Sequence, residues 1–546
     1  MTMFISLFVS TLLAGAPIPA SGKLPDPIAT IQFAPIEVLE KDVFRFVQSL
    51  PFPEKDKIVQ EMKDGLKKAL GDSGWDGLDI KKPGTGYLVF DEKNPDKSYG
   101  FIVAPVTDEK KFIELFKRIG QAGDSKNHLE EVKGNPGLYK LVGKNDDEPK
   151  HLRVHNGYAY LGINAPLEAF AADKLVPPEK TLNPKETAKI AVTVLAERLP
   201  KEWTQKGLEE FQSKARQGIE QMPNLTKEFK NILNQGINLV PKYAKQIQSE
   251  GDSFGFRVQY EDAIKYELFL KGKPGTTLAK DIAERKPTTN RFAGILNDKT
   301  VAGFQFKLPF LNEDLRGLSS KGLEEYYKDL CEKDPPPADL KQLLDQVVPR
   351  LSTTIKSGDF DLSGALNGPN AKSTYTAVLG IALDDAVGIT PVLKEVLDKQ
   401  AGGMIEWDTH ESEGMKIHTI NVVPLIPADI KKVIGNNATC QFALTKSGVF
   451  LTLGQDAIPE IKRAMALKPS PASVLDVKVN AVKLSKIVEG FNPMAAQQMS
   501  TFVGNQNKLL SIYSLNVKGG SELTIDLDLG YTLFAGFVWT GMRAAP

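Results

Sequence analysis

HLRVHNGYAYLGIN occupies residues 151–164, and FALTKSGVFLTLGQ occupies residues 442–455. Each segment places apolar residues at alternate positions around a short polar turn, which is the pattern of a β-hairpin. Asn156-Gly157 is a strong two-residue turn signal, because both residues tolerate the positive φ angles that match strand twist. Ser447-Gly448 fills the equivalent place in the later segment. The two segments predict one kind of hairpin that occurs twice in the chain.

Two more pairs of similar segments precede these hairpins in the same order. The first pair, residues 99–123 and 375–402, reads as a strand followed by an amphipathic helix with an acidic start. The second pair, GLYKLVG (137–143) and GMKIHTI (414–420), reads as a short strand. Three matched pairs in one order indicate an internal duplication.

The two helices of the first pair carry further signals. Thr107-Asp108 and Asp384-Asp385 are placed to cap the helix N-termini. Both helices run into the tripeptide Gln-Ala-Gly, at 121–123 and 400–402, with the glycine placed as a left-handed C-cap. Apolar residues recur at helical spacing, so each helix should bury one stripe. The stripes are Phe112, Leu115, Phe116 and Ile119 in the earlier copy, and Ile389, Leu393, Val396 and Leu397 in the later copy.

A second kind of unit, a strand followed by a helical region and a β-hairpin, occurs four times. These units begin with IATIQFAPIEVL, AKIAVTVLAERL, TVAGFQFKLPFL and SVLDVKVNAVKL, and they close at Val106, Phe269, Leu383 and Leu529. TTIKSGDFDLSGAL (353–366) and SLNVKGGSELTIDLDL (514–529) read as closing hairpins that turn on glycine.

Together these patterns predict an α+β chain, rich in antiparallel sheet and covered by helices. The duplication divides it into two homologous halves, residues 24–285 and 290–546. The seam is ERKPTTNRF (284–292), which is polar and contains proline.

The start of the chain indicates export. An apolar run from Phe4 to Ala16 is followed by small residues, which fits a signal peptide over residues 1–20 with cleavage after Ala20. The run is too short to span a membrane, and no transmembrane segment is expected in the mature chain. We therefore expect a periplasmic or extracellular protein.

Composition excludes one partner class. Lys+Arg and Asp+Glu are both 68, so the chain lacks the basic excess typical of a nucleic-acid binder. Cys331 and Cys440 are the only cysteines; they either pair after export or stay as two free thiols. The apolar tail GYTLFAGFVWTG (530–541) reads as a last core strand, or else as an exposed apolar edge.

The histidines do not form a metal motif. In a strand, His151 and His155 share a face but lie about 13 Å apart, which is too far for one metal ion. His128 stands alone. His410 and His418 lie near acidic residues, without the spacing of a zinc site. No metal ligand is predicted.

Two groups of acids were candidates for chemistry. Asp72 and Asp76 occupy positions one and five of a calcium-loop pattern whose positions three and twelve lack carboxylates, so a glycine-rich helix end explains them better. The pairs Asp359 and Asp361, and Asp526 and Asp528, alternate along strands and read as a solvated sheet face. No catalytic residue and no cofactor site is predicted, since nucleophile-elbow and phosphate-loop motifs do not occur.

The export signal, the two β-rich halves and the lack of a catalytic motif resemble large, uncharacterised secreted proteins of planctomycete-like bacteria. That resemblance supplies no functional residues. The leading hypothesis is an exported, non-enzymatic binding or structural protein whose partner is a protein, a peptide or an apolar ligand. Alternatives are an extracytoplasmic carrier of lipid or another apolar ligand, and a hydrolase with a carboxylate site between the halves. An exposed apolar patch favours the first, an enclosed apolar cavity the second and converging polar groups the third.

Overall fold

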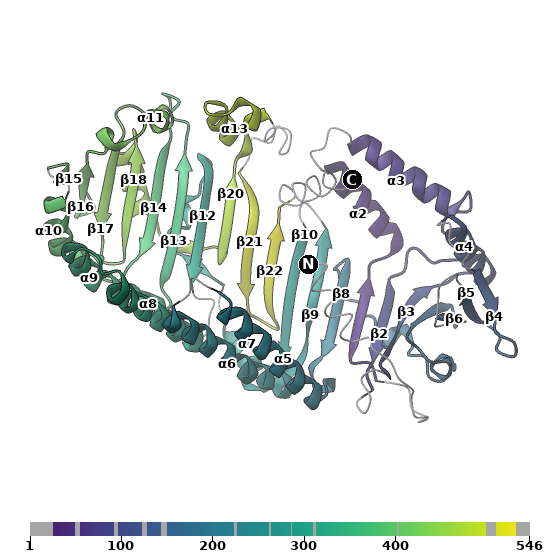
Figure 1. Cartoon of the computed structure of the whole chain (residues 1–546). Helices are drawn as coiled ribbons and strands as arrows, with labels where there is room; N and C mark the ends of the chain where they lie inside the picture. The colour runs from purple at the N-terminus through teal and green to yellow at the C-terminus, as the bar shows by residue number, and fades with distance from the viewer. Residues whose placement is uncertain are drawn as a thin grey trace. The chain divides into compact units, whose positions relative to one another are not determined.

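The structure is a computed structural model that describes residues 26–49, 55–91, 97–122, 128–142, 150–222, 226–260, 264–285, 287–308, 313–400, 403–497 and 509–530. The chain forms two compact units (Figure 1). Unit 1 comprises residues 1–204 and 247–280, and unit 2 comprises residues 205–246 and 281–546. Residues 205–246, which the duplication assigns to the first half, cluster with unit 2.

Unit 1 contains a sheet of ten described strands, each antiparallel to its neighbours. Their order across the sheet is β4-β5-β6-β7-β3-β2-β1-β8-β9-β10. The strands are β1 (Ala29–Phe33), β2 (Gly84–Val89), β3 (Tyr99–Pro105), β4 (His128–Glu131), β5 (Leu138–Val142), β6 (Lys150–His155), β7 (Tyr158–Ile163), β8 (Ile190–Leu195), β9 (Gly251–Tyr260) and β10 (Ile264–Gly272).

Unit 2 also contains a sheet of ten described antiparallel strands, in the order β15-β16-β17-β18-β14-β13-β12-β20-β21-β22. Taken in chain order, its strands occupy the same positions across the sheet as those of unit 1. The strands are β12 (Thr300–Leu308), β13 (Phe360–Asn367), β14 (Thr376–Ala382), β15 (Ile405–Ser412), β16 (Met415–Ile420), β17 (Thr439–Leu444), β18 (Gly448–Gly454), β20 (Leu475–Val479), β21 (Leu510–Lys518) and β22 (Leu523–Leu529). Two short strands, β11 (Thr289–Asn290) and β19 (Ser470–Pro471), pair with each other.

Helices connect these strands in the predicted way, and the α+β class is confirmed. All four strand, helix and hairpin units are present: β1-α2-α3-β2-β3, β8-α5-α6-β9-β10, β12-α8-α9-β13-β14 and β20-α13-β21-β22. The α-helices are α2 (Ile36–Ser49), α3 (Lys55–Leu70), α4 (Glu109–Ala122), α5 (Lys201–Glu220), α6 (Lys227–Glu250), α7 (Thr277–Glu284), α8 (Glu313–Lys333), α9 (Ala338–Ser357), α10 (Thr390–Gln400), α11 (Ala428–Ile434), α12 (Ala457–Met465) and α13 (Ala481–Glu489).

The first predicted hairpin is confirmed in detail, and the second needs a correction. β6 and β7 pair around Asn156-Gly157, whose φ angles are 49° and 76°. β17 and β18 also form a hairpin, but the Thr445 N–H donates to the Gly448 carbonyl, so the turn lies one residue earlier, at 446–447.

The segment TTIKSG (353–358) was wrongly predicted as a strand. Residues 353–357 are the last turn of α9, and Gly358 closes that helix with φ 95° while its N–H donates to the carbonyls of Ile355 and Thr354. Glycine in this left-handed conformation is a common helix end. Packing of α9 therefore outweighs the strand preference of Thr and Ile at these positions. The hairpin is formed by β13 and β14 instead.

The predicted stripes of the two helices lie mostly in the core. In α4, Phe112 and Leu115 are buried, whereas Ile119 is 42% exposed. Ile389 and Val396 are buried in the later copy, although Ile389 lies in the short 3₁₀ helix η6 (Ala386–Ile389) that precedes α10.

One of the two predicted helix N-caps is present and the other is not. Asp108 caps α4, since its Oδ1 accepts the Lys111 N–H at 3.0 Å. Asp385 makes no capping bond, and its carbonyl accepts from the Arg350 Nε at 3.2 Å. The glycine C-caps at 123 and 402 fall outside the described residues.

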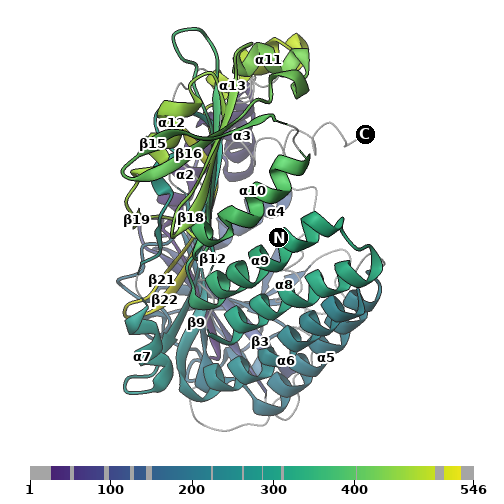
Figure 2. The same cartoon turned by 90° about the vertical axis from the view of Figure 1, so that its left-hand side faces the viewer.

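Each sheet has two differently covered faces. In unit 1, α4 packs on one face, through Phe112 and Ile113 against Leu152 and Ala159. In unit 2, α9 and α10 lie on the corresponding face (Figure 2), where Leu351 and Leu393 pack with Phe442. We call the face that carries α4 or α10 the helix face of its unit.

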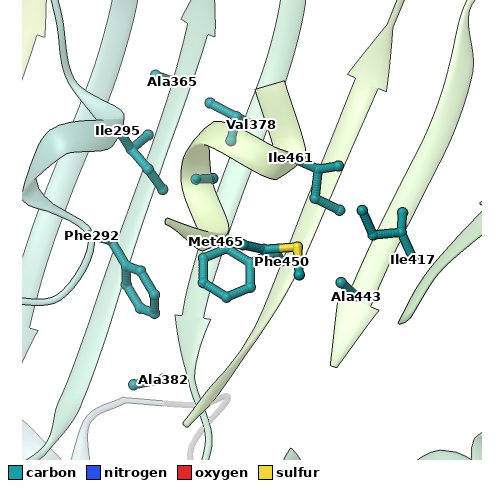
Figure 3. Close-up of a cluster of buried hydrophobic side chains, with 11 residues drawn as sticks. Phe292, Ile295, Ala365, Val378, Ala382, Ile417, Ala443, Phe450, Ile461 and Met465 are labelled. Carbon is teal, nitrogen blue, oxygen red and sulfur yellow. The ribbon is translucent and has the colours of Figure 1, made fainter. Parts of the chain in front are cut away.

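Other segments cover the opposite faces. In unit 1 the 3₁₀ helix η2 (Leu167–Phe170) packs there, and Phe170 lies against Phe101 with ring centroids 5.0 Å apart. In unit 2 the cover is α12 together with the 3₁₀ helix η5 (Ala293–Ile295), and Figure 3 shows Ile295, Ile461 and Met465 over the strands.

No helix in the described ranges is long and apolar enough to cross a membrane. The expected signal peptide (1–20) and nearly all of the apolar tail (531–541) lie outside the described residues.

Gly77 offers a test of the packing of α4. Its φ is +96°, and an added Cβ would lie 2.2 Å from the backbone nitrogen of Phe112. Gly74 has φ +55° with open space around it. We expect Gly77→Ala to destabilise the protein by about 3 kcal/mol and the control Gly74→Ala by about 1 kcal/mol, because only the former adds a clash to backbone strain. Urea unfolding measures both; equal losses would contradict the packing described here.

Candidate functional site

One row of apolar side chains crosses seven strands on the helix face of unit 1. Each member is the register partner of the next, so the row runs perpendicular to the strands. Its members, from β7 to β10, are Leu161, Ile102, Gly86, Ile31, Val192, Phe256 and Leu268. We call it the first row.

A corresponding row crosses the equivalent seven strands of unit 2. From β18 to β22 its members are Leu451, Leu379, Gly364, Phe304, Val477, Tyr513 and Leu529. We call it the second row. Both rows have seven members, and both have glycine in the third place.

These rows hold the exposed apolar surface of the sheets. Among the described strand residues, the large apolar side chains classed as exposed are Ile102 (40%), Leu268 (54%), Phe304 (37%) and Leu451 (37%). All four belong to the two rows, two in each. Antiparallel sheets commonly leave one face to water, but that face is then polar. Here the helix faces expose large apolar side chains.

The neighbouring rows on the same face extend this surface. In unit 1 they contain Leu88, Ala29, Val194, Phe254 and Leu270 on one side, and Gly84, Phe33, Ile190, Val258 and Tyr266 on the other. In unit 2 they contain Ala377, Leu366, Ala302, Val479 and Leu510 on one side, and Ile381, Leu362, Phe306, Leu475, Leu515 and Leu527 on the other. None of these residues is charged.

The two glycines let neighbouring side chains lie flat in the rows. A Cβ on Gly86 would come 2.8 Å from Cγ2 of Ile31, and a Cβ on Gly364 would come 2.9 Å from Cε1 of Phe304. The missing side chain therefore leaves room that Ile31 and Phe304 occupy.

In the strands that carry the rows, ion pairs lie on the opposite faces. Arg257 Nε lies 3.0 Å from Glu186 Oε2 in unit 1. In unit 2, Lys518 Nζ lies 2.6 Å from Asp526 Oδ2. Alternation along each strand separates these groups from the rows.

Asp361 corrects the prediction of a solvated acidic pair. Its side chain is fully buried; Oδ1 lies 2.8 Å from Lys307 Nζ, and Oδ2 accepts the Arg291 N–H at 3.0 Å. Asp359 is 58% exposed, as predicted, but it precedes β13 (Phe360–Asn367) and does not lie in the strand. Its partners Arg291 and Lys307 lie 70 and 54 residues away in the chain, a long-range arrangement that strand alternation alone does not reveal. Asp361 thus serves an ion pair, which is different from the paired acids of a hydrolase.

The Asp72 and Asp76 segment is built as a helix end. Gly71 and Gly77 have φ +67° and +96°. The carbonyls of Leu70 and Gly74 accept hydrogen bonds from Arg118 at 2.8 and 3.2 Å. The Arg118 guanidinium is therefore hydrogen-bonded to carbonyl oxygens of the kind that would coordinate a calcium ion.

The two histidines of the first hairpin lie in a strand, as predicted. His151 and His155 belong to β6, and the His151 ring lies 5.8 Å from that of Phe170. In the described part of the chain no group of three or more His, Cys, Asp or Glu is placed to hold a metal ion.

His418 lies in an unusual setting at the helix face of unit 2. It is 4% exposed, with the Trp407 and Phe442 rings 4.8 and 4.9 Å away. Its Nδ1 accepts the Asp408 N–H at 3.1 Å. Burial lowers its pKa from the ordinary value, Asp408 opposes that shift and Lys394 adds to it. A neutral ring fits this role, because Nδ1 can accept only when unprotonated.

Both cysteines are free thiols in the structure. Cys331 is partly buried in α8, and Cys440 is buried in β17. Burial raises the pKa of Cys440 to about 11.

A shallow open hollow lies between α6 and α8. Its lining is Gln235, Leu239, Asp314, Gly317, Leu318 and Lys321. Lys242 and Tyr243 both bind the Asp314 carboxylate, at 2.6 and 2.9 Å, and the bonds from them lower its pKa. The acid of this hollow, Asp314, is already hydrogen-bonded to Lys242 and Tyr243, and the hollow is open to solvent.

Sequence reasoning missed the rows. Each strand shows an apolar side by alternation, as in IAVTVL of β8. A row, however, joins residues up to 237 positions apart, such as Ile31 on β1 and Leu268 on β10. Only the strand order brings them together.

Comparisons with known proteins add little here. No protein-family model matches the chain, and no curated protein matches it. Among solved structures, crystal form I of TP0453 is similar, with 9% sequence identity and a TM-score of 0.21 over 50% of this chain and 88% of that one. A likeness this distant carries no argument about fold or function.

The buried Cys440 gives a simple chemical test. With a pKa near 11, this thiol stays protonated at pH 8 and should not react with a thiol reagent in the folded protein. We expect Cys331→Ser to show no reacting thiol when folded and one when unfolded in urea. Cys440→Ser is the matched control. Rapid labelling of folded Cys331→Ser would contradict the placement of Cys440.

His418 predicts acid sensitivity. Its folded pKa lies below the unfolded value of about 6.5, so as pH falls through 6.5 only the unfolded chain gains a proton and stability is lost. We expect His418→Phe to reduce the loss of unfolding free energy between pH 7.5 and 5.5 by at most about 1 kcal/mol. His410→Phe, on the adjacent strand, is the control, and urea unfolding at both pH values is the measurement. An unchanged pH dependence in His418→Phe would refute the effect.

Proposed function

We propose that this is an exported, non-enzymatic binding protein that takes up apolar ligands on the first and second rows. The observation that carries the proposal is that, in the strands the structure describes, the exposed large apolar residues all lie in these rows. Extended apolar surface on a protein in water marks an interaction site, because leaving it uncovered costs about 25 cal/mol per Å². Export rests on the start of the sequence.

The two rows support this function over the alternatives. A hydrolase needs acids held in contrasting environments next to a cleft, whereas Asp361 and Asp526 lie in ion pairs on the opposite face. A carrier that encloses its ligand would need a cavity lined by Phe, Leu and Val. The rows present such side chains on a partly exposed sheet face and not in an enclosed cavity, which favours a binding surface over an enclosing carrier.

We further propose that the two units arose by duplication. The same strand order, and the same place for glycine in each row, are what copying a ten-strand unit would produce. Under this proposal each unit carries one binding surface.

Binding of an uncharged apolar dye, Nile red, tests the function. We expect saturable binding to two sites. The double variants Ile102→Gln/Leu268→Gln and Phe304→Gln/Leu451→Gln should each halve the number of sites, because an amide in the row resists desolvation. Leu425→Gln is the control, since Leu425 is 69% exposed but lies away from the sheets, in the 3₁₀ helix η7 (Val423–Leu425). Fluorescence titration measures the number of sites. Equal binding by all four proteins would refute the proposed surface.

A further inference from the structure

We propose that each row binds one free long-chain fatty acid, with its hydrocarbon chain lying along the row across the strands. This inference rests on the proposed function and specifies its ligand. Three features of the rows point to this occupant: their chemistry, their length and their setting beside helices.

The chemistry of the rows fits a hydrocarbon. The first row offers only aliphatic groups and one phenyl ring, and in the second row the Tyr513 hydroxyl is the one polar side-chain group. The backbone groups of these strands pair within the ladders. A protein partner normally forms about one hydrogen bond per 100–200 Å² of interface, and these rows offer almost none. A methylene chain has no polar group to leave unsatisfied, and the carboxylate stays in water at an end of the row that is open to solvent, such as Leu268, which is 54% exposed.

The length of the rows also fits. From Ile102 to Leu268 the first row crosses five inter-strand spacings, which is about 24 Å at 4.8 Å each. One leaflet of a bilayer, and so one extended acyl chain, is about 15 Å thick in its hydrocarbon part. A single long chain can therefore lie wholly within a row. The exposed members Ile102 and Leu268 bound the stretch of about 24 Å within which the chain lies.

The setting favours a single molecule over a membrane surface. In unit 2, α9 and α10 stand on the same face as the second row, packed against Phe442, the register partner of Leu451. The row therefore begins beside a helical layer that a flat bilayer would have to displace.

Native mass spectrometry and calorimetry of the full chain with hexadecanoate and dodecanoate test this inference. We expect two molecules bound per chain, and hexadecanoate bound at least tenfold more tightly than dodecanoate, because each added methylene lies on the row. Ile102→Gln/Leu268→Gln and Phe304→Gln/Leu451→Gln should each lose one of the two molecules. Leu425→Gln should keep both.

The remaining outcomes separate this inference from the function on which it rests. If Nile red binds the rows but hexadecanoate does not, the fatty-acid assignment is overturned and the binding surface stands. If the protein sediments with neutral phosphatidylcholine vesicles and the row variants do not, the rows bind a membrane surface and not a free fatty acid. If the protein forms concentration-dependent dimers and those variants do not, the rows bind a second copy of this protein and not a fatty acid. If neither dye nor fatty acid binds, both proposals fail.

Discussion

The antiparallel ladder is the constraint on which the rest of the structure depends. Because side chains alternate along a strand and neighbouring strands are held in register, residues from strands far apart in the sequence form one row on one face. In unit 1 this places Ile102 in line with Leu268; in unit 2 it places Leu451 in line with Leu529. A slip of one residue in any strand would move its apolar set to the other face.

The same alternation separates two kinds of surface. The helix faces carry apolar rows that remain partly exposed, while the opposite faces carry buried charges such as Asp361 and Asp476. A buried carboxylate is tolerated only with a partner, and here Lys307 and Lys478 supply the partners at 2.8 and 3.1 Å. In the strands that carry the rows, the buried ion pairs thus lie on one side of the sheet, and the apolar rows lie on the other.

Glycine has a particular place in this arrangement. Gly86 and Gly364 occupy the same position in the two rows, and in both cases a neighbouring side chain fills the space that a Cβ would take. Glycine in a strand interior weakens the sheet and often marks a close approach. In both rows, therefore, the close approach of the neighbouring side chain depends on the missing Cβ.

The sequence by itself determined the elements of local origin. It predicted the Asn156-Gly157 hairpin, the four strand, helix and hairpin units and the α+β class, because turn residues and apolar periodicity act over a few residues. It failed for residues 353–357, where helix packing decided over strand preference, and for Asp361, whose partners come from segments 54 and 70 residues away. Only the tertiary structure decided the strand order, and therefore the rows. The reason is physical: alternation fixes which side of a strand is apolar, but register between distant strands fixes which apolar sides meet.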